Sequence, residues 1–359
     1  MIAYISKKIG YALLTLFGVV SVVFLLFNIL PGDPAQMMLG ENQSEEQLQQ
    51  LRKKYGFDLS LSEQYVLYLN DLSPLSIHST HAESVYYFDE SKYSGWRLLS
   101  TENRNLVLKL PYLRESFQKN GKKVSQVIVE TLPNTIVLAV TAICIAFIIG
   151  CFLGIISALN KDSWLDQLIQ IVATLGMSIP SFFSAVIFAW LFGYVLHKYT
   201  QLNMTGSLYE LDDFGEKNML QLKNLILPSV VLGIRPLAVV SQLMRNAMLE
   251  VLGQDYIRTA KAKGLTKAQI VWKHAFKNSL NPVITAISGW FASLLAGAVF
   301  VEYIFGWNGL GKEIVDSLNT LDLPVIMGAV LIIASMFISI NIVVDILYAY
   351  LDPKVRNQA

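Results

Sequence analysis

Residues 306–313, with the sequence GWNGLGKE, come close to a motif that holds the phosphates of a nucleotide. The phosphate loop reads G-x-x-x-x-G-K-[ST], and its last residue supplies a hydroxyl group to magnesium. Glu313 stands in that position, so the hydroxyl group is missing. The segment also follows a long apolar run instead of a short buried strand. We expect its glycines to form a tight turn between two helices, and we expect no nucleotide site in this chain.

Ionisable residues inside apolar segments form a second group of candidates. A charge at membrane depth is costly unless it faces water, a partner or the membrane surface. Arg235 and Glu302 are therefore candidates for a transport path, with Arg235 the stronger by position. Glu302 and Asp345 have an open alternative, which is to reach the two membrane surfaces.

The histidines do not have the spacing of a catalytic or metal site. His78 and His81 are three residues apart, but no third ligand accompanies them, and no H-E-x-x-H motif occurs. We expect no catalytic residue, bound cofactor or metal in this chain, which argues against an intramembrane enzyme. A passive channel or a lipid-bound scaffold remains as another alternative.

The composition defines the class of protein that must position these residues. Hydrophobic residues make up 53% of the chain and charged residues only 15%, against about 25% charged in soluble domains. The mean hydropathy is +0.46. This balance predicts an all-α integral membrane protein in a lipid bilayer. A net charge of +1 argues against binding to nucleic acid.

Runs of about 20 apolar residues are long enough to cross the bilayer as helices. Six segments meet this test and predict six transmembrane helices, with a bend at Pro180 in the third. The segments are Ile9–Leu30, Pro133–Leu159, Leu168–Leu196, Leu225–Leu249, Pro282–Phe305 and Leu323–Leu351.

Charge asymmetry orients these helices, because short cytoplasmic loops carry an excess of Lys and Arg. Lys7 and Lys8 precede the first helix, and the loop 254–281 and the tail 352–359 are also basic. Glu313 and Asp316 lie on the opposite, acidic side. We therefore expect both termini in the cytoplasm.

The loop 254–281 is the most unusual segment, because it is basic and polar between two long apolar runs. It has no acidic residue after Asp255. Gly264 suits the left-handed position after a helix end, and Thr266 with Gln269 has the spacing of a capping box. This predicts a helix, a turn and a second helix. An alternative is a solvated loop attracted to anionic lipid. Its cations are Arg258, Lys261, Lys263, Lys267, Lys273 and Lys277.

Three parts follow from this pattern: a first transmembrane helix (1–30), an extracytoplasmic segment (31–123) and a five-helix core (124–359). Ser44 and Gln47 have capping-box spacing, and Gly56 is placed to end the helix that they begin. From about residue 71 to 123 the sequence has no clear period, so no fold is predicted for that piece.

Four stretches, in this order along the chain, resemble binding-protein-dependent ABC importer permeases, specifically their dipeptide, oligopeptide and nickel branch. The stretch 255–283, from DYIRTAKAKGL to HAFKNSLNPV, is similar to the cytoplasmic EAA loop of that family. The other three are LPGDPA at 30–35, FGWNGLG at 305–311 and LDPKVR at 351–356. The PGDPA start resembles the first-subunit type of permease. The long segment 71–123 departs from the family pattern.

The resemblance implies a type I importer permease fold in the bacterial cytoplasmic (inner) membrane. It implies a second permease subunit of the same family, two cytosolic ABC ATPases that bind ATP and magnesium, and an extracytoplasmic substrate-binding protein. The cargo would be a peptide, with nickel or another small solute as the alternative.

By the same resemblance, the first helix of the basic loop would insert into a groove of an ATPase and couple nucleotide-driven closure to alternating access. The residues that would do so are Asp255, Tyr256, Arg258, Ala260, Lys261, Ala262, Lys263 and Gly264. Ala260 and Ala262 would keep that helix slim.

Overall fold

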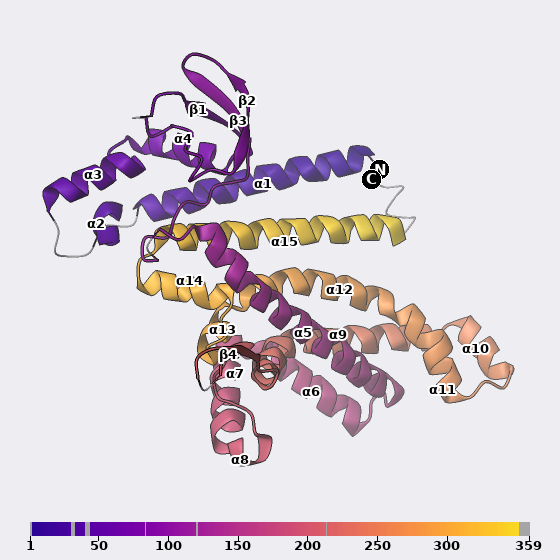
Figure 1. The fold of residues 1–359 in the computed structure, drawn as a ribbon. Helices are drawn as coiled ribbons and strands as arrows, with labels where there is room; N and C mark the ends of the chain where they lie inside the picture. Colours follow the sequence, from indigo (N-terminus) through magenta and orange to yellow (C-terminus); the bar gives the residue numbers. More distant parts are fainter. Residues whose placement is uncertain are drawn as a thin grey trace. The chain divides into compact units, whose positions relative to one another are not determined.

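The computed structural model describes residues 2–29, 33–39, 44–82, 84–119, 121–212 and 214–351. These residues form two compact units (Figure 1). Unit 1 comprises Met1–Ala12, Thr131–Glu313 and Ile333–Ala359, and unit 2 comprises Leu13–Glu130 and Ile314–Ile332. The tail 352–359 and the first half of LPGDPA lie outside the described residues, so the expected cytoplasmic tail has no structural counterpart here.

Long apolar helices dominate the described chain, as the composition predicts. Five of them are long and apolar enough to cross a membrane: Ser6–Asn28, Val124–Leu159, Lys223–Leu252, Lys267–Ala296 and Leu323–Val344. They correspond to α1 (Ile2–Ile29), α5 (Val124–Leu159), α9 (Lys223–Leu252), α12 (Phe276–Gly297) with the turns before it, and α15 (Leu323–Leu351).

The third expected helix is interrupted. It consists of α6 (Trp164–Ser178), followed by α7 (Ser181–Phe188) and the π-helix η1 (Ala189–Val195), and the two parts meet at an angle of 106°. Pro180 lies at the break, where its ring and missing N–H prevent a continuous helix. The predicted bend is confirmed, and it interrupts the helix completely. The described residues contain six candidate spans only if this bent pair is counted as one span.

The fifth expected helix has different boundaries from the predicted Pro282–Phe305. The helical chain begins at α11 (Lys267–Gln269), continues through the π-helix η2 (Ile270–Ala275) into α12, and then breaks before α13 (Val299–Phe305). Pro282 lies inside α12. The later basic residues of the loop, Lys267, Lys273 and Lys277, therefore lie in the first turns of this longer helical segment, and not in a second, separate loop helix.

In unit 1, α9 packs against both α6 and α12. Gly150 and Gly154 permit the close approach of α5 to α9, as small residues four apart commonly do. A β-carbon on Gly154 would lie 2.6 Å from the carbonyl oxygen of Ser241 and 2.7 Å from Cβ of Met244. The main buried cluster of this unit includes Leu138, Leu232, Phe305 and Trp307.

Unit 2 begins with α1 and contains the short helices α2 (Pro34–Leu39), α3 (Glu45–Tyr55) and α4 (Leu61–Leu72). The capping box of Ser44 and Gln47 is confirmed, and Gly56 ends α3 with a left-handed φ of 72°. A second capping box, of Ser60 and Glu63, begins α4.

The segment for which no fold was predicted forms an antiparallel sheet, so the chain is mostly helical and not all-α. Its strands are β1 (Leu75–Ser79), β2 (Gly95–Ser100) and β3 (Arg104–Lys109), in the order β1-β3-β2. Under the sheet, Asp71 accepts hydrogen bonds from Tyr93 (2.8 Å) and Arg114 (3.2 Å). Burial lowers the pKa of Lys109, on β3, to about 8.

The remaining elements of the described chain are short. They are α8 (His197–Thr200), a two-stranded antiparallel sheet of β4 (Tyr209–Leu211) and β5 (Asn218–Leu220), α10 (Asp255–Ala262) and α14 (Leu310–Asn319).

Candidate functional site

The basic loop forms a short helix, α10, that is packed onto its own chain. Figure 1 shows α10 and α11 together at one end of α9 and α12. Ile257 and Ala260 face inward and are buried against Ile270, with Leu252 and Leu265 beside them. This cluster therefore joins α10 to the end of α9 and to the chain that leads into α12.

The outward face of α10 is polar, cationic and exposed. Arg258 and Asp255 form an ion pair at 3.4 Å, which lies in solvent and stabilises little. The expected coupling residues on this face are Asp255, Tyr256, Arg258, Lys261, Ala262, Lys263 and Gly264, and all of them are exposed. Ala260 differs, because it is buried at 7% exposure against the chain itself. Its small side chain therefore permits the packing of α10 onto its own chain.

Gly264 has the backbone conformation that its position predicted. Its φ is +79°, and a β-carbon there would meet nothing within 4 Å. The Gly264 N–H donates to the Lys261 carbonyl (3.0 Å), and the Leu265 N–H donates to that of Ala260 (3.3 Å). This pair of bonds is a Schellman motif, in which a left-handed residue reverses the chain after a helix. The predicted capping box of Thr266 and Gln269 then begins α11.

A side-chain hydrogen bond also links α10 to α12. The Asn278 amide donates to the Tyr256 hydroxyl (3.0 Å) and to the His274 carbonyl (2.9 Å). Tyr256 therefore connects the coupling segment to α12 in addition to the apolar cluster.

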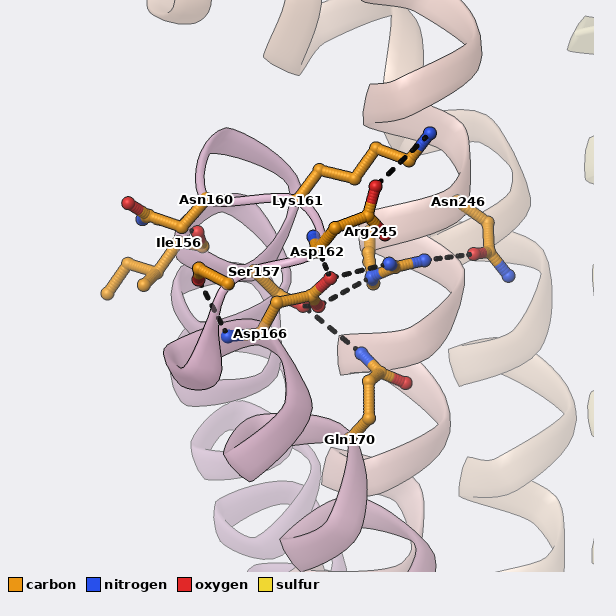
Figure 2. Close-up of polar contacts among 10 residues, drawn as sticks. Ile156, Ser157, Asn160, Lys161, Asp162, Asp166, Gln170, Arg245 and Asn246 are labelled. Atoms are coloured by element: carbon orange, nitrogen blue, oxygen red, sulfur yellow. Dashed lines mark hydrogen bonds and ion pairs between the residues drawn. The ribbon is translucent and has the colours of Figure 1, made fainter.

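A buried ion pair lies close to the α10 end of α9, and Figure 2 shows its partners. Arg245 on α9 donates from Nε and Nη2 to the two carboxylate oxygens of Asp166, at 2.8 and 2.6 Å. Asp166 also accepts hydrogen bonds from the Ser157 hydroxyl and from the Asp162 N–H. Gln170 donates to Ser157 at 3.1 Å. The pair therefore joins the first turn of α6 to α9, about two helical turns before the end of α9.

This ion pair is absent from the expectations drawn from the sequence. A signal for it exists in the sequence. Arg245 is one of few charges in a long, mainly apolar segment, and Asp166 follows the N-cap Ser163 by three residues. The pairing of two residues 79 positions apart needs the tertiary structure.

The glycine-rich segment forms the expected turn. Gly306 ends α13 with φ +65°. The amides that would hold a phosphate are occupied, because Glu302 Oε2 accepts from the N–H groups of Gly311 (2.7 Å) and Lys312 (3.2 Å). A β-carbon on Gly309 would lie 2.4 Å from the same carboxylate oxygen. Glu302 is fully buried and holds this turn from within the chain.

Arg235 has a different environment from Glu302. It lies near the middle of α9, is exposed, and makes no ion pair with any residue in the described ranges. On the same face of α9 follow Gln242, Asn246 and Glu250, at spacings that place them above one another on a helix.

Two of the helices that pack against α9, namely α6 and α12, carry similar polar rows. On α6 the row is Gln167, Gln170, Thr174 and Ser178, and on α12 it is Asn278, Asn281, Thr285 and Ser288. These side chains are exposed or half-buried. The Thr and Ser hydroxyls of these two rows donate to carbonyls four residues earlier in their own helices. The Gln and Asn amides have polar atoms that lipid cannot satisfy, so they favour a side of the helix that faces water or protein.

Known proteins are similar to the chain over its whole length. The dipeptide transport system permease protein DppB of Alkalihalophilus pseudofirmus is 32% identical over 99% of this chain and 100% of its own. The di/tripeptide transport system permease protein DppB of Pseudomonas aeruginosa is 32% identical over 100% of both chains. The dipeptide transport system permease protein DppB of Haemophilus influenzae is 33% identical over 99% of this chain and 100% of its own.

A solved inward-facing structure of the MetNI methionine ABC transporter has a TM-score of 0.48 and 17% identity over 64% of this chain and 97% of its own, which is too low to carry an argument. Two family models match. The N-terminal model of binding-protein-dependent transport system membrane components covers residues 1–81. The model of the binding-protein-dependent transport system inner membrane component covers residues 150–357, which is more than half of the chain. The chain therefore belongs to the family of binding-protein-dependent transport system inner membrane components, which are permease subunits of ABC importers.

Proposed function

We propose that this chain is the permease subunit of an importer that moves dipeptides or other short peptides across the bacterial inner membrane by alternating access. The observation that carries the proposal is its similarity over the full length to permeases named for dipeptides and for di- and tripeptides. A second permease subunit, two cytosolic ATPases and an extracytoplasmic binding protein would complete the importer. ATP and magnesium would be bound by the ATPases, and this chain would not be an enzyme.

The proposed topology has six spans, with α6, α7 and η1 counted as one bent span. Both termini and α10 would then lie in the cytoplasm, which the excess of basic residues in 254–281 supports. The chain would consist of a first helix (1–30), an extracytoplasmic segment (31–123) and a five-helix core (124–359).

The proposed contact with the ATPase is the outward face of α10. Its cationic residues Arg258 and Lys261 suit an acidic groove, where rim charges set orientation and association rate more than affinity. The inward residues Ile257 and Ala260 would keep α10 rigidly joined to α9 and to the start of α12. Movement of the ATPase would then move both membrane helices together.

The proposed transport path runs along the polar rows of α6, α9 and α12. Arg235 is the one cation in these rows, and a guanidinium group binds a carboxylate in a two-pronged geometry. We propose that it receives the carboxylate of the peptide. Glu302 was also a candidate for the path, but its burial and its bonds to Gly311 and Lys312 favour a role in holding the turn before α14.

The test is uptake by proteoliposomes that contain this chain and its partner subunits, with ATP on the ATPase side and binding protein on the other. Labelled di- or tripeptide should accumulate, and nickel should not. Accumulation of nickel without peptide would refute the proposed cargo.

Arg235→Gln should raise the KM for peptide uptake, while the complex still assembles. Lys198→Gln, which removes an exposed cation outside the polar rows, is the matched control and should behave as the parent. An unchanged KM in Arg235→Gln would place this residue off the path.

The orientation is tested with single cysteines in a variant without Cys144 and Cys151. Cysteine at the exposed positions Ser44 and Thr205 should react with an impermeant thiol reagent in intact cells, and cysteine at Thr266 should not. Labelling of Thr266 from outside would invert the topology.

A further inference from the structure

The three-stranded sheet of unit 2 has an apolar outward face, while its inward face combines buried polar side chains with the apolar Val107, which packs with Phe88 and Tyr93. An antiparallel sheet with one solvated face normally turns its apolar side inward. Here Ser76 and His78 of β1 and Asn105 of β3 are buried, with His78 at 1% exposure. Leu75 and Ile77, which alternate with Ser76 and His78 along β1, are exposed. On β2, Trp96 is 77% exposed and Leu99 is 67% exposed, and the strand register places them beside Leu108 and Leu106 of β3.

The outward apolar residues form two rows across all three strands. One row is Leu75, Leu108 and Trp96, and the other is Ile77, Leu106 and Leu99, as the strand register pairs them. Leu98 and Leu110 are exposed beside the rows. We call these eight residues the apolar sheet face. Exposed apolar patches that extend over several strands mark an interaction surface.

Helix α4, which leads into the sheet, is attached to the last turns of the candidate span in α1. The Tyr65 hydroxyl of α4 hydrogen-bonds to the Ser21 hydroxyl of α1 (2.6 Å), and Tyr65 and Tyr68 both contact the ring of Phe24. Ser21 and Phe24 lie about 6–10 Å along α1 before Asn28, where the candidate span ends. Helix α4 therefore lies beside the last turns of the span.

The sheet follows α4 directly and is held to it. The side-chain amide of Asn70 on α4 donates to the carbonyl of Ile77 (3.0 Å) and accepts from its N–H (2.9 Å), so it closes the free edge of β1. Val22, Leu25 and Leu26 of α1 and Val66 of α4 are exposed and apolar as well.

We propose that the apolar sheet face rests in the bilayer leaflet at the Ile29 end of α1, with phospholipid as its occupant. Under the topology proposed above, this is the outer leaflet. A tryptophan at the edge of an aliphatic surface suits the membrane–water interface, where its ring is amphipathic. The buried polar network of His78, Asn105 and Lys109 then lies on the side of the sheet away from the lipid. The sheet is an added membrane anchor that fixes α4 beside α1.

A soluble binding protein is a poorer occupant for this surface. Non-obligate interfaces are about as apolar as the rest of a protein surface. Two apolar rows, in which five of the six side chains are exposed, exceed that composition. A surface of this kind would also have to be covered between docking events.

The test uses spin labels on single cysteines in the assembled transporter in lipid nanodiscs, in the variant without native cysteines. Leu99→Cys and Leu108→Cys report on the apolar sheet face, and Ser91→Cys is an exposed control in the β1–β2 connection. At Leu99 and Leu108 the label should collide more often with oxygen, which concentrates in lipid, than with a water-soluble nickel chelate. At Ser91 the order should reverse.

Two other results would overturn the proposal. If the nickel chelate reaches the labels at Leu99 and Leu108, and binding protein then blocks this access, the surface is a contact for that protein. Exclusion of both reagents would assign it to another subunit. A second measurement needs no spin label. Brominated lipid should quench the tryptophan fluorescence of the parent protein more than that of Trp96→Phe. Equal quenching of the two proteins would contradict contact of Trp96 with lipid.

Discussion

Replacing Gly264 by valine tests whether the turn after α10 sets the direction of the coupling segment. The φ of Gly264 is +79°, and no atom lies within 4 Å of the position of a β-carbon. The substitution therefore creates no clash, and its cost is the backbone strain of a left-handed residue, about 1–2 kcal/mol. That cost lowers the population of the native turn, relative to other conformations of the same segment, by a factor of about 5–30.

This cost is too small to unfold the membrane helices but large enough to misdirect α10. We expect normal membrane levels of Gly264→Val, weaker co-purification of the ATPase and reduced peptide uptake. Membrane level, ATPase recovery and uptake are measured on the same preparations, so a failure of folding is distinguished from a failure of coupling.

Two variants serve as controls. Gly264→Asn should retain most activity, because asparagine enters the left-handed region with less strain. Gly253→Ala, at the end of α9, should be neutral or slightly stabilising, because its φ of −81° suits any residue. Parent-like uptake and ATPase recovery by Gly264→Val would refute the assignment of 255–264 as the coupling element.

Three further predictions concern packing and charge. Asp166→Ala leaves Arg245 without its partner and should lower the free energy of unfolding by about 3–5 kcal/mol, which a thermal denaturation assay of the purified protein measures. The double variant Asp166→Ala with Arg245→Met should recover part of this stability, and an equal loss in the double variant would contradict the pairing. Gly154→Ala overpacks the contact of α5 with α9 and should lower the stability of the protein by about 1–3 kcal/mol. Gly289→Ala in α12 is the control, because a β-carbon there has free space and should not destabilise the protein. The same thermal assay compares the two variants, and equal stability would argue against the close contact. Lys312→Ala should leave the ATPase activity of the assembled complex within about twofold, and a loss of nucleotide binding would show that the glycine turn is a phosphate loop.

Local sequence signals predicted the local structure well. The capping boxes at Ser44 and Thr266, the left-handed glycines Gly56 and Gly264, and the break at Pro180 each depend on the backbone geometry of a few neighbouring residues. Apolar runs located the spans, because the thickness of the bilayer sets their length. Their ends were less certain, and Pro282 became an interior residue of α12 because the basic turns before it continue the helix.

The candidate site was predicted as a segment, but its faces were not. Nothing in the spacing of α10 distinguishes the side that packs on Ile270 from the side that is free, and so Ala260 was expected on the outer face. The three-stranded sheet was missed because its strands are only five or six residues long. Only β1 alternates apolar with polar residues, whereas β2 is interrupted by an irregular register and β3 contains three consecutive apolar residues.

The sequence alone determined that the chain is a membrane protein, that it resembles an importer permease, and that 255–264 is its unusual loop. These conclusions depend on composition and on residues that are close together along the chain. Only the tertiary structure decided that Asp166 meets Arg245, that Glu302 holds a turn while Arg235 is exposed, and that the sheet is apolar on its outside. Each of those depends on which helix or strand packs against which, and packing is settled by shape and burial between residues far apart in sequence.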